Sequence, residues 1–290
     1  MFQPLFDPPS RPTVSEVLDL WYSHTSRSQD AESLKNRLRI LNEFRESFGD
    51  HLAESLQPLA VSAWVFTHES WKSDWTLFRV FLTLKAPLNW AVRVSLLPRN
   101  PISQLSHPKG DPVRPLTERE FLLLLRASKP LFRRVLWFLA LTGARPGEIR
   151  RIQWADLDFE RGAVVLQKHK TRKSLKTPRP RVIVLNDSAC RLLAWIRRHQ
   201  AEKSEFVFLN SKGRQWTRNA VCLRIRSLRE KTGIPKDAKL YGLRHRFGTR
   251  QCKKGTPLKV LAELMGHSTT RMTEHYTHLA GDIAYLRNYI

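Results

Sequence analysis

The sequence predicts a mainly α-helical protein of two domains, with a small antiparallel β-sheet in the second domain. Three observations support this fold class. Apolar side chains recur at helical spacing through the first hundred residues, a proline-rich stretch without periodicity follows, and two short β-rich runs lie among the later helical patterns. A chain of 290 residues is also long for one compact domain and comfortable for two.

The first domain, residues 1–100, is expected to be all helical. Its helical patterns cover residues 13–27, 31–49, 59–68 and 71–95. Thr13 is a suitable N-cap for the first helix, and Pro87 is expected to break or kink the last. Five prolines between residues 96 and 115 then predict a linker, which we place at 101–115.

The second domain, residues 116–290, opens with Thr117 and Glu120 at the spacing of a capping box. Further helices are expected at 131–142, 187–202 and 217–231, and strands at 163–167, 181–185 and 206–209. The first two strands flank a very basic connection and would form a hairpin, so the domain is mixed α/β. We assign Trp137, Phe138 and Trp154 to the core rather than to base stacking.

The net charge of +24 is concentrated in the second part of the chain. Residues 1–110 carry 12 Lys or Arg against 11 Asp or Glu, whereas residues 111–290 carry 38 against 15. Such an excess repels itself unless a polyanion neutralises it, and nucleic acid is the commonest such partner. A basic surface that serves only solubility fits this magnitude less well.

Other partners and sites have little support in the sequence. No apolar run approaches the ~18 residues of a transmembrane helix, and the start of the chain lacks the pattern of a secretory signal. Three scattered cysteines argue against a disulfide framework and against zinc. We therefore expect no membrane partner, no metal and no cofactor, and a location in a bacterial-type cytoplasm or nucleoid.

Two stretches place arginines where they suit an anionic ligand. In residues 141–159, Arg145 follows a Thr-Gly break at a helix start, with Glu148 one turn on. A surface ion pair between these two residues is the alternative. In residues 241–250, Tyr241 precedes Arg244 by three positions, which puts both on one helix face, and His245 comes next.

Two more stretches complete the set. The predicted hairpin, residues 166–182, has seven Lys or Arg from 168 to 181, and it either reaches a phosphate backbone or forms a solvated face. In residues 264–279, His267 precedes Tyr276 by nine positions. Two further histidines flank Tyr276, but without a third ligand they make a weak metal site.

Together, in order and in spacing, these stretches resemble the tyrosine recombinase family, the phage-type integrases, over residues 113–282. T-G-x-R-x-x-E at 142–148 resembles the family's first arginine box, and Lys170 in H-K-T matches its mobile active-site lysine. Y-G-L-R-H resembles the H-x-L-R-H box, and L-M-G-H resembles the L-G-H motif that precedes the tyrosine. Less specifically, residues 1–100 are similar to the family's helical core-binding domain.

The resemblance implies a DNA strand transferase that needs no cofactor. Tyr276 would attack a phosphodiester, form a 3′-phosphotyrosine and free a 5′-hydroxyl. Arg145, Arg244 and His267 would bind the non-bridging oxygens of the transition state. Lys170 would protonate the leaving 5′-oxygen.

Other residues would assist this reaction. Glu148 would orient the arginine and histidine neighbourhood, and Lys168, Arg172 and Lys173 of the hairpin would contact DNA. The chain departs from the family's pattern at Tyr241, where a histidine usually stands as base or proton relay. A neutral tyrosine accepts protons poorly at pH 7, so the base could be His245, His267 or water.

The implied partners are double-stranded DNA and three further copies of the chain, as a tetramer on two DNA sites, with accessory DNA-bending proteins in addition. Residues 280–290 would either dock into a neighbouring copy or pack on their own domain. The leading function is site-specific recombination. Two alternatives stay open: a type IB topoisomerase, and a DNA-binding protein with a vestigial site.

Overall fold

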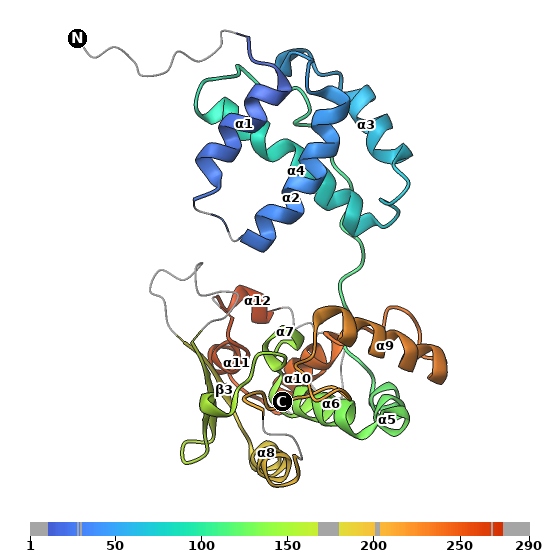
Figure 1. Cartoon of the computed structure of the whole chain (residues 1–290), viewed down its shortest axis with the longest axis vertical. Coiled ribbons are helices and arrows are strands. Elements are labelled where there is room, and N and C mark those ends of the chain that lie inside the picture. Colours follow the sequence, from blue (N-terminus) through green and yellow to red (C-terminus); the bar gives the residue numbers. More distant parts are fainter. Residues whose placement is uncertain are drawn as a thin grey trace, which may run out of the picture. The chain divides into compact units, whose positions relative to one another are not determined.

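The computed structural model in Figure 1 describes residues 11–27, 29, 31–167, 180–200, 204–267 and 269–274. The chain divides into two compact units, Met1–Asp111 and Pro112–Ile290. The molecule is mainly helical with one small antiparallel sheet in the second unit, which confirms the expected fold class. In the described part of the chain, no helix is both long enough and apolar enough to cross a membrane.

The first unit is built from helices around a core of its own. They are α1 (Val14–Thr25), α2 (Ala31–Phe48), α3 (Pro58–Thr67) and α4 (Asp74–Arg93), with a 3-10 turn at Ala53–Ser55. Thr13 caps α1 as expected, because its hydroxyl accepts from the backbone N–H of Glu16 while the Glu16 carboxylate accepts from the backbone N–H of Thr13. The cap therefore fixes where α1 begins.

Two features of the first unit differ from the sequence pattern. Helix α4 continues through Pro87, so the expected break is absent. Pro87 is buried between Leu84 and Leu88 on the face that packs into the core, and this packing offsets the missing hydrogen bond. Leu97 and Ile102 are 3% and 0% exposed, so the residues after α4 also belong to this core.

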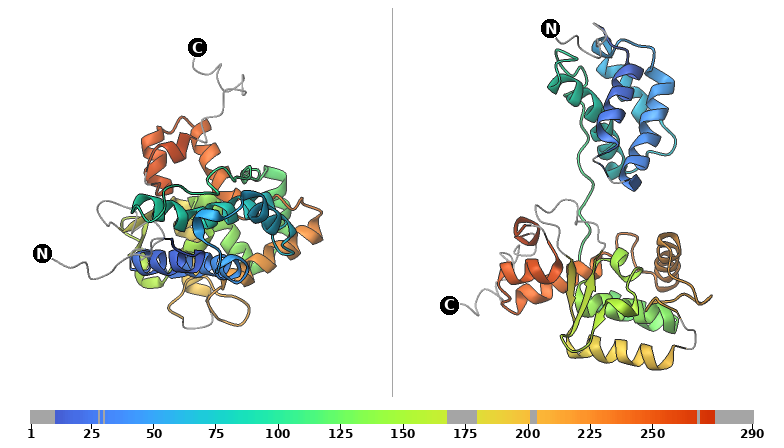
Figure 2. Two further views of the ribbon diagram at one scale, coloured as in Figure 1. Left: turned by 90° about the horizontal axis from the view of Figure 1, so that it is seen from above. Right: turned by 60° about the vertical axis from the view of Figure 1, so that its left-hand side comes forward.

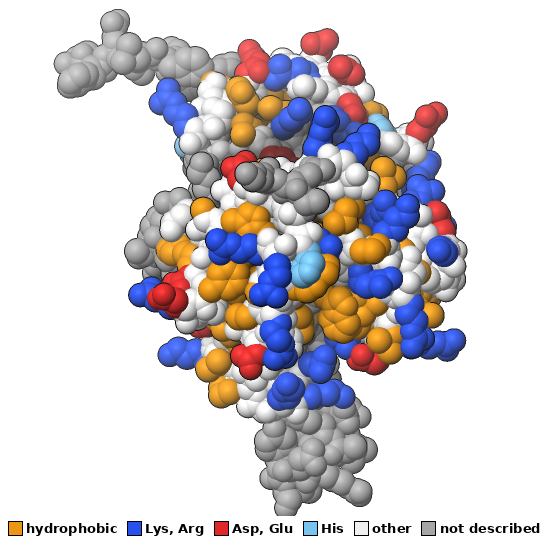
Figure 3. Space-filling model, turned by 60° about the horizontal axis from the view of Figure 1, so that its bottom comes forward, with side chains coloured by type: hydrophobic (Ala, Val, Ile, Leu, Met, Phe, Trp, Pro, Cys, Tyr) orange, Lys and Arg blue, Asp and Glu red, His pale blue; other side chains and the backbone are white. Residues whose placement is uncertain are grey.

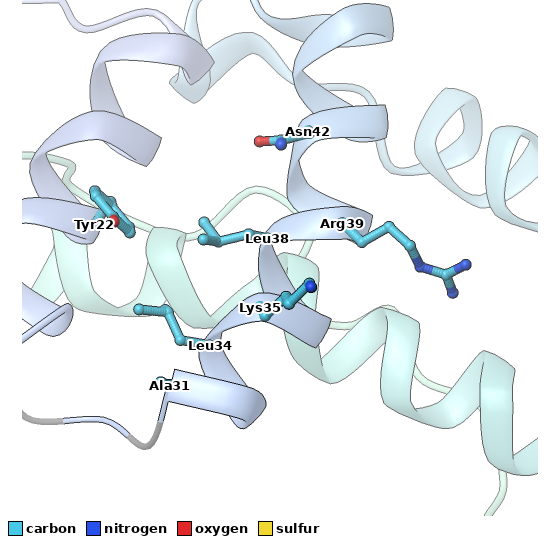
Figure 4. Close-up of a pocket in the computed structure, with 7 residues that line it drawn as sticks. All are labelled: Tyr22, Ala31, Leu34, Lys35, Leu38, Arg39 and Asn42. Carbon is cyan, nitrogen blue, oxygen red and sulfur yellow. The ribbon is translucent and has the colours of Figure 1, made fainter. Parts of the chain in front are cut away.

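A shallow pocket lies between α1 and α2 in the first unit (Figure 4). Leu34 and Leu38 of α2 line it, and their side chains point toward Tyr22 of α1. The side chain of Arg39 points away from Tyr22. The pocket is thus an apolar surface depression between two helices, with polar side chains at its edge.

The second unit packs helices against a three-stranded sheet. The helices are α5 (Glu118–Ala127), α6 (Pro130–Thr142), α7 (Pro146–Ile149), α8 (Asp187–His199), α9 (Arg218–Thr232), α10 (Gly242–Lys253), α11 (Leu258–Met265) and α12 (Arg271–Glu274), with a 3-10 turn at Trp154–Asp156. The strands β1 (Leu157–Asp158), β2 (Ala163–Leu166) and β3 (Arg181–Val184) are antiparallel in the order β1-β2-β3. The register pairs Val164 with Ile183 and Leu166 with Arg181. In the right-hand view of Figure 2 the sheet stands between α11, in orange, and α6, in green.

The strand expected at residues 206–209 is corrected. Residues 206–209 form no strand of the sheet, because Phe206 and Leu209 make only isolated bridges, to Gln153 and Gln215. The apolar run instead reflects burial in the core, where Val207 and Phe208 are 2% and 3% exposed.

The aromatic assignments divide between core and surface. Phe138 is fully buried and Trp154 packs against the core, but Trp137 is 41% exposed. The surface face in Figure 3 shows Lys and Arg side chains spread among hydrophobic ones. On α8, Trp195 is also exposed, and the guanidinium of Arg134 lies 4.7 Å from its ring centroid.

Candidate active site

Residues from four separate elements form one cluster in the second unit, in which the carboxylate of Glu148 pairs with two arginines. Nη1 of Arg145 lies 2.8 Å from Oε1 of Glu148, and Nε of Arg181 lies 3.6 Å from the same oxygen. Arg244 lowers the pKa of both Arg181 and His267, and Arg145 does the same, so these four residues lie close together. The cluster therefore joins α7, β3, α10 and the end of α11.

Arg145 stands at the start of α7, as the sequence predicts. Its backbone N–H donates to Oε2 of Glu148 at 2.8 Å, and its Nη2 donates to the backbone oxygen of Gly266 at 2.8 Å. The side chain is 13% exposed. Arg145 is thus paired with Glu148, but it lies inside the cluster and not on an open surface.

Arg244 lies in the first turn of α10 and is fully buried. Its Nη1 donates to the backbone oxygen of Gly143 at 2.8 Å, and its Nη2 donates to the backbone oxygen of Met265 at 2.5 Å. Gly143 ends α6 with φ of +63°, and a Cβ there would lie 2.4 Å from Cδ1 of Phe247. Only glycine fits this turn, which presents its carbonyl oxygen to Arg244.

His267 follows the C-terminal turn of α11. Its backbone N–H donates to the oxygen of Ala262 at 2.9 Å, and its Nδ1 lies 2.8 Å from Oγ1 of Thr273. Burial, together with the positive charges of Arg244 and Arg145, lowers the pKa of His267 to about 3. The ring is therefore neutral at pH 7. If the Thr273 hydroxyl donates to Nδ1, then Nε2 carries the proton and becomes the donor.

Glu148 stays ionised although it is buried, with 7% exposure. Burial alone would raise the pKa of its carboxyl, but the charges of Arg181 and Arg145 outweigh burial and hold the pKa below its usual value. One carboxylate thus fixes the positions of two guanidiniums.

Arg181 and Thr273 were not recognised as site residues from the sequence. Arg181 counts there as one cation among many in the basic connection, and Thr273 as one hydroxyl in a polar stretch. A signal for Arg181 does exist, because side chains alternate along a strand and Arg181 is in phase with the buried Ile183. A charged residue at an inward position of a strand indicates a partner inside the protein.

Tyr241 directly precedes α10, and its ring packs edge-on against the ring of His245, with centroids 5.1 Å apart. His245 in turn lies close enough to His267 to lower its pKa. The position that departs from the family's pattern is therefore connected to the cluster through His245.

Five of the expected site residues lie outside the described residues. They are Lys168, Lys170, Arg172, Lys173 and Tyr276. The same holds for the segment 280–290. The structure brings together Arg145, Glu148, Arg244 and His267, with His245 and Tyr241 beside them.

The arrangement suits an anion that gains charge during a reaction. Two guanidiniums face one carboxylate, a third guanidinium, that of Arg244, acts on the same histidine as they do, and the neutral imidazole adds a hydrogen-bond donor. A phosphate bound there would meet donors that are already oriented by backbone oxygens, so that little reorganisation is needed. Among the described residues there is no group of three or more His, Cys, Asp or Glu side chains that could hold a metal ion.

Comparison with known proteins gives consistent results. The model of the family described as "Phage integrase family" matches residues 115–282. The chain is 29% identical over 221 residues to tyrosine recombinase XerC of Roseiflexus castenholzii, which covers 70% of this chain and 68% of that recombinase.

Solved structures with the same fold include two integrases. The Tn1549 transposon integrase in complex with a circular intermediate DNA is 20% identical with a TM-score of 0.76, covering 91% of this chain and 95% of that one. A λ integrase tetramer bound to a Holliday junction is 17% identical with a TM-score of 0.71, covering 93% and 84%. At these identities the likeness concerns the fold.

Proposed function

Since this chain belongs to the phage integrase family, the tyrosine recombinases, we propose that it is a site-specific DNA recombinase that works through a covalent 3′-phosphotyrosine. The family makes it a DNA strand transferase. What we propose beyond this family activity is which DNA strands are joined and which residues carry out the reaction.

The observation that carries the proposal is the donor cluster formed by Arg145, Arg244 and His267. All three side chains are held by backbone oxygens or by a hydroxyl, and two of the three are less than a tenth exposed. A guanidinium has five N–H donors, so one that is held by two carbonyl oxygens can still bind a phosphate oxygen. The non-bridging oxygens of a phosphorane-like transition state need such donors.

We assign the chemical steps as follows. The Tyr276 oxygen attacks the phosphorus of a DNA phosphodiester and forms the P–O bond of the phosphotyrosine, while the bond to the 5′-oxygen breaks. Lys170 donates the proton that the leaving 5′-oxygen needs. In the second half the 5′-hydroxyl of another strand attacks the phosphotyrosine, so the phosphodiester energy is conserved and no cofactor is consumed.

The proton of the Tyr276 phenol needs an acceptor, because a free tyrosine side chain, with a pKa of about 10, is protonated at pH 7. His267 is a poor candidate, since burial and the neighbouring guanidiniums lower its pKa to about 3. His245, whose ring contacts Tyr241, and water remain as acceptors. We therefore assign His267 to phosphate binding and leave the acceptor between those two.

The proposed partner is double-stranded DNA, bound by a tetramer of this chain. The excess of Lys and Arg after residue 110 supplies the charge for contacts to the phosphate backbone, and we assign Lys168, Arg172 and Lys173 to those contacts. We further assign residues 1–100 as the core-binding domain and 116–290 as the catalytic domain, joined by 101–115. The solved λ integrase tetramer on a Holliday junction supports the same assembly here.

A strand-exchange assay tests recombination against simple relaxation. The DNA site is first recovered by trapping covalent adducts from a genomic library, and two differently labelled duplexes with that site are then incubated with the protein in EDTA. Recombinant duplexes are expected. Relaxation of supercoiled plasmid without exchange would instead indicate a topoisomerase, and binding without either reaction would indicate a vestigial site.

A further inference from the structure

A buried arginine outside the family motifs, Arg181, occupies the middle of the site. It begins β3 and is 4% exposed. Its Nη2 donates to the backbone oxygen of Leu264 at 2.9 Å, and its Nη1 lies 2.5 Å from the oxygen of Val182 and 3.4 Å from that of Glu263. The guanidinium therefore binds carbonyl oxygens in the last turn of α11.

Burial of the charged Arg181 guanidinium is unfavourable by itself. The pKa of Arg181 is lowered to about 10, mainly by burial, because the charge of Glu148 offsets only part of that effect. The positive charges of Arg244 and Arg145 act in the same direction as burial. At neutral pH the guanidinium is still charged, so the fold holds a third cation where an apolar side chain would be less costly.

Arg181 also packs against Gly266, the residue that connects α11 to His267. Gly266 ends α11 with φ of +62°, and a Cβ at this position would lie 2.6 Å from Nε of Arg181. The oxygen of the same glycine accepts the hydrogen bond of Arg145, and the next residue is His267. Arg181 and Arg145 thus hold this turn from two sides, and Glu148 lies beside both.

We propose that Arg181 is a positioning residue for strand cleavage, which holds the turn at Gly266 so that the donors of Arg145 and His267 keep a single geometry around the phosphate. The inference rests on the proposed function. In this role Arg181 does not bind DNA. It acts through the carbonyl groups of α11 and through Glu148.

If Arg181 had a purely structural role, it would only hold the C-terminal end of α11. The two roles differ in their electrostatic effect on the His267 ring. Among the residues that the structure describes, the charged or titratable groups that lower the pKa of this ring are Arg244, Arg145, Arg181 and His245. Loss of the Arg181 charge should raise the pKa of His267, whereas loss of helix packing alone should lower stability without that shift.

The experiment compares full-length Arg181→Gln and Arg181→Lys with wild type. The matched control is Arg161→Gln, because Arg161 lies in the loop before β2 with 87% of its side chain exposed. Single-turnover cleavage of a nicked suicide duplex, DNA affinity, melting temperature and the His267 titration by NMR are measured for each. We expect Arg181→Gln to cleave about 100-fold more slowly, the size of effect that a 1 Å misplacement gives, with DNA affinity within about threefold.

Further expectations separate the variants. Arg181→Lys keeps the charge but not the two-pronged contact, so it should recover part of the rate and leave the His267 pKa nearer to the wild-type value. If Arg181→Gln does not fold, the lysine variant alone should still cleave more slowly than wild type. Arg161→Gln should match wild type in every measurement.

Two results would overturn the inference: a wild-type cleavage rate in Arg181→Gln, or a slow rate with an unchanged His267 pKa and no gain in Arg181→Lys. Absence of cleavage by the wild type would overturn the proposed function instead. In that case the His267 titration still tests the contact, and an unchanged pKa in Arg181→Gln would reject it as well.

Discussion

Nη2 of Arg145 donates a 2.8 Å hydrogen bond to the backbone oxygen of Gly266, which lies 121 residues later in the chain. This bond joins the turn after α6 to the turn after α11. Because the guanidinium is also held by Glu148 on the opposite side, its orientation is set before any phosphate arrives. The predictions below follow from this preorganised cluster.

Substitution of Gly266 tests how tightly the turn is packed. Gly266→Ala combines a left-handed backbone conformation with a Cβ 2.6 Å from Nε of Arg181, so we expect a loss of roughly 2–5 kcal/mol in the free energy of unfolding. Gly233→Ala is the control, since Gly233 has φ of +67° and nothing within 4 Å of the added Cβ. It should lose only about 1–2 kcal/mol. Equal losses in urea denaturation would show that Arg181 does not pack against the turn.

The ionisation of His267 gives a pH-dependent prediction. Its pKa is lowered to about 3 in the folded protein, against an ordinary value of 6.5, so its NMR signals should not shift between pH 8 and pH 5. In urea the same ring should titrate near 6.5. A titration of His267 above pH 5 in the folded protein would show that the three guanidiniums do not surround it as described.

The same pKa shift affects stability. Below about pH 6.5 the unfolded chain binds a proton at His267 and the folded chain does not, so stability should fall as the pH falls, by at most about 1.4 kcal/mol per pH unit for this group. The effect should end near pH 3, where the folded state also becomes protonated. In His267→Gln the free energy of unfolding should depend less on pH over this range.

The geometry of Arg244 predicts that charge alone does not replace it. Lysine cannot reach the oxygens of Gly143 and Met265 together, so Arg244→Lys should reduce single-turnover cleavage by roughly 10²–10³-fold while DNA affinity changes little. Arg226→Lys serves as control, because Arg226 is paired with Glu230 on an exposed helix face. Cleavage by Arg244→Lys within threefold of wild type would contradict the assigned role.

The hydroxyl of Thr273 is expected to select the tautomer of His267. Thr273→Val keeps the shape but removes the partner of Nδ1, and should slow cleavage roughly tenfold, as expected for a loss of about 1 kcal/mol or slightly more. Thr273→Ser retains the hydroxyl and should stay close to the wild-type rate. Serine and valine variants with the same rate would mean that the contact has no part in the reaction.

Sequence patterns find those parts of the site that depend on local spacing. Arg145, Arg244 and His267 each occur in a short motif, and the structure brings these three together. Arg181 was missed because a single cation in a basic stretch has no local signature except its inward phase on β3. The backbone oxygens that Arg181 contacts belong to α11, more than eighty residues away in the chain.

For the fold too, the sequence predicts local interactions well and tertiary packing poorly. Helix starts with capping boxes, such as those at Thr13 and Thr117, were predicted correctly because a cap is a local interaction. The break that was one of two outcomes expected at Pro87 and the strand expected at residues 206–209 are both absent, because tertiary packing decides them. Burial keeps α4 continuous through the proline, and it places the apolar run of 206–209 in the core without strand pairing.

The most direct test of the account is the trapping of a covalent complex. Nicked suicide duplexes made from a genomic library are incubated in EDTA with wild type and with Tyr276→Phe, and the products are separated under denaturing conditions. The account predicts a protein–DNA adduct for wild type that resists EDTA and is absent in Tyr276→Phe, with DNA binding retained. An adduct that persists in Tyr276→Phe, or DNA binding by wild type without any adduct, would contradict it.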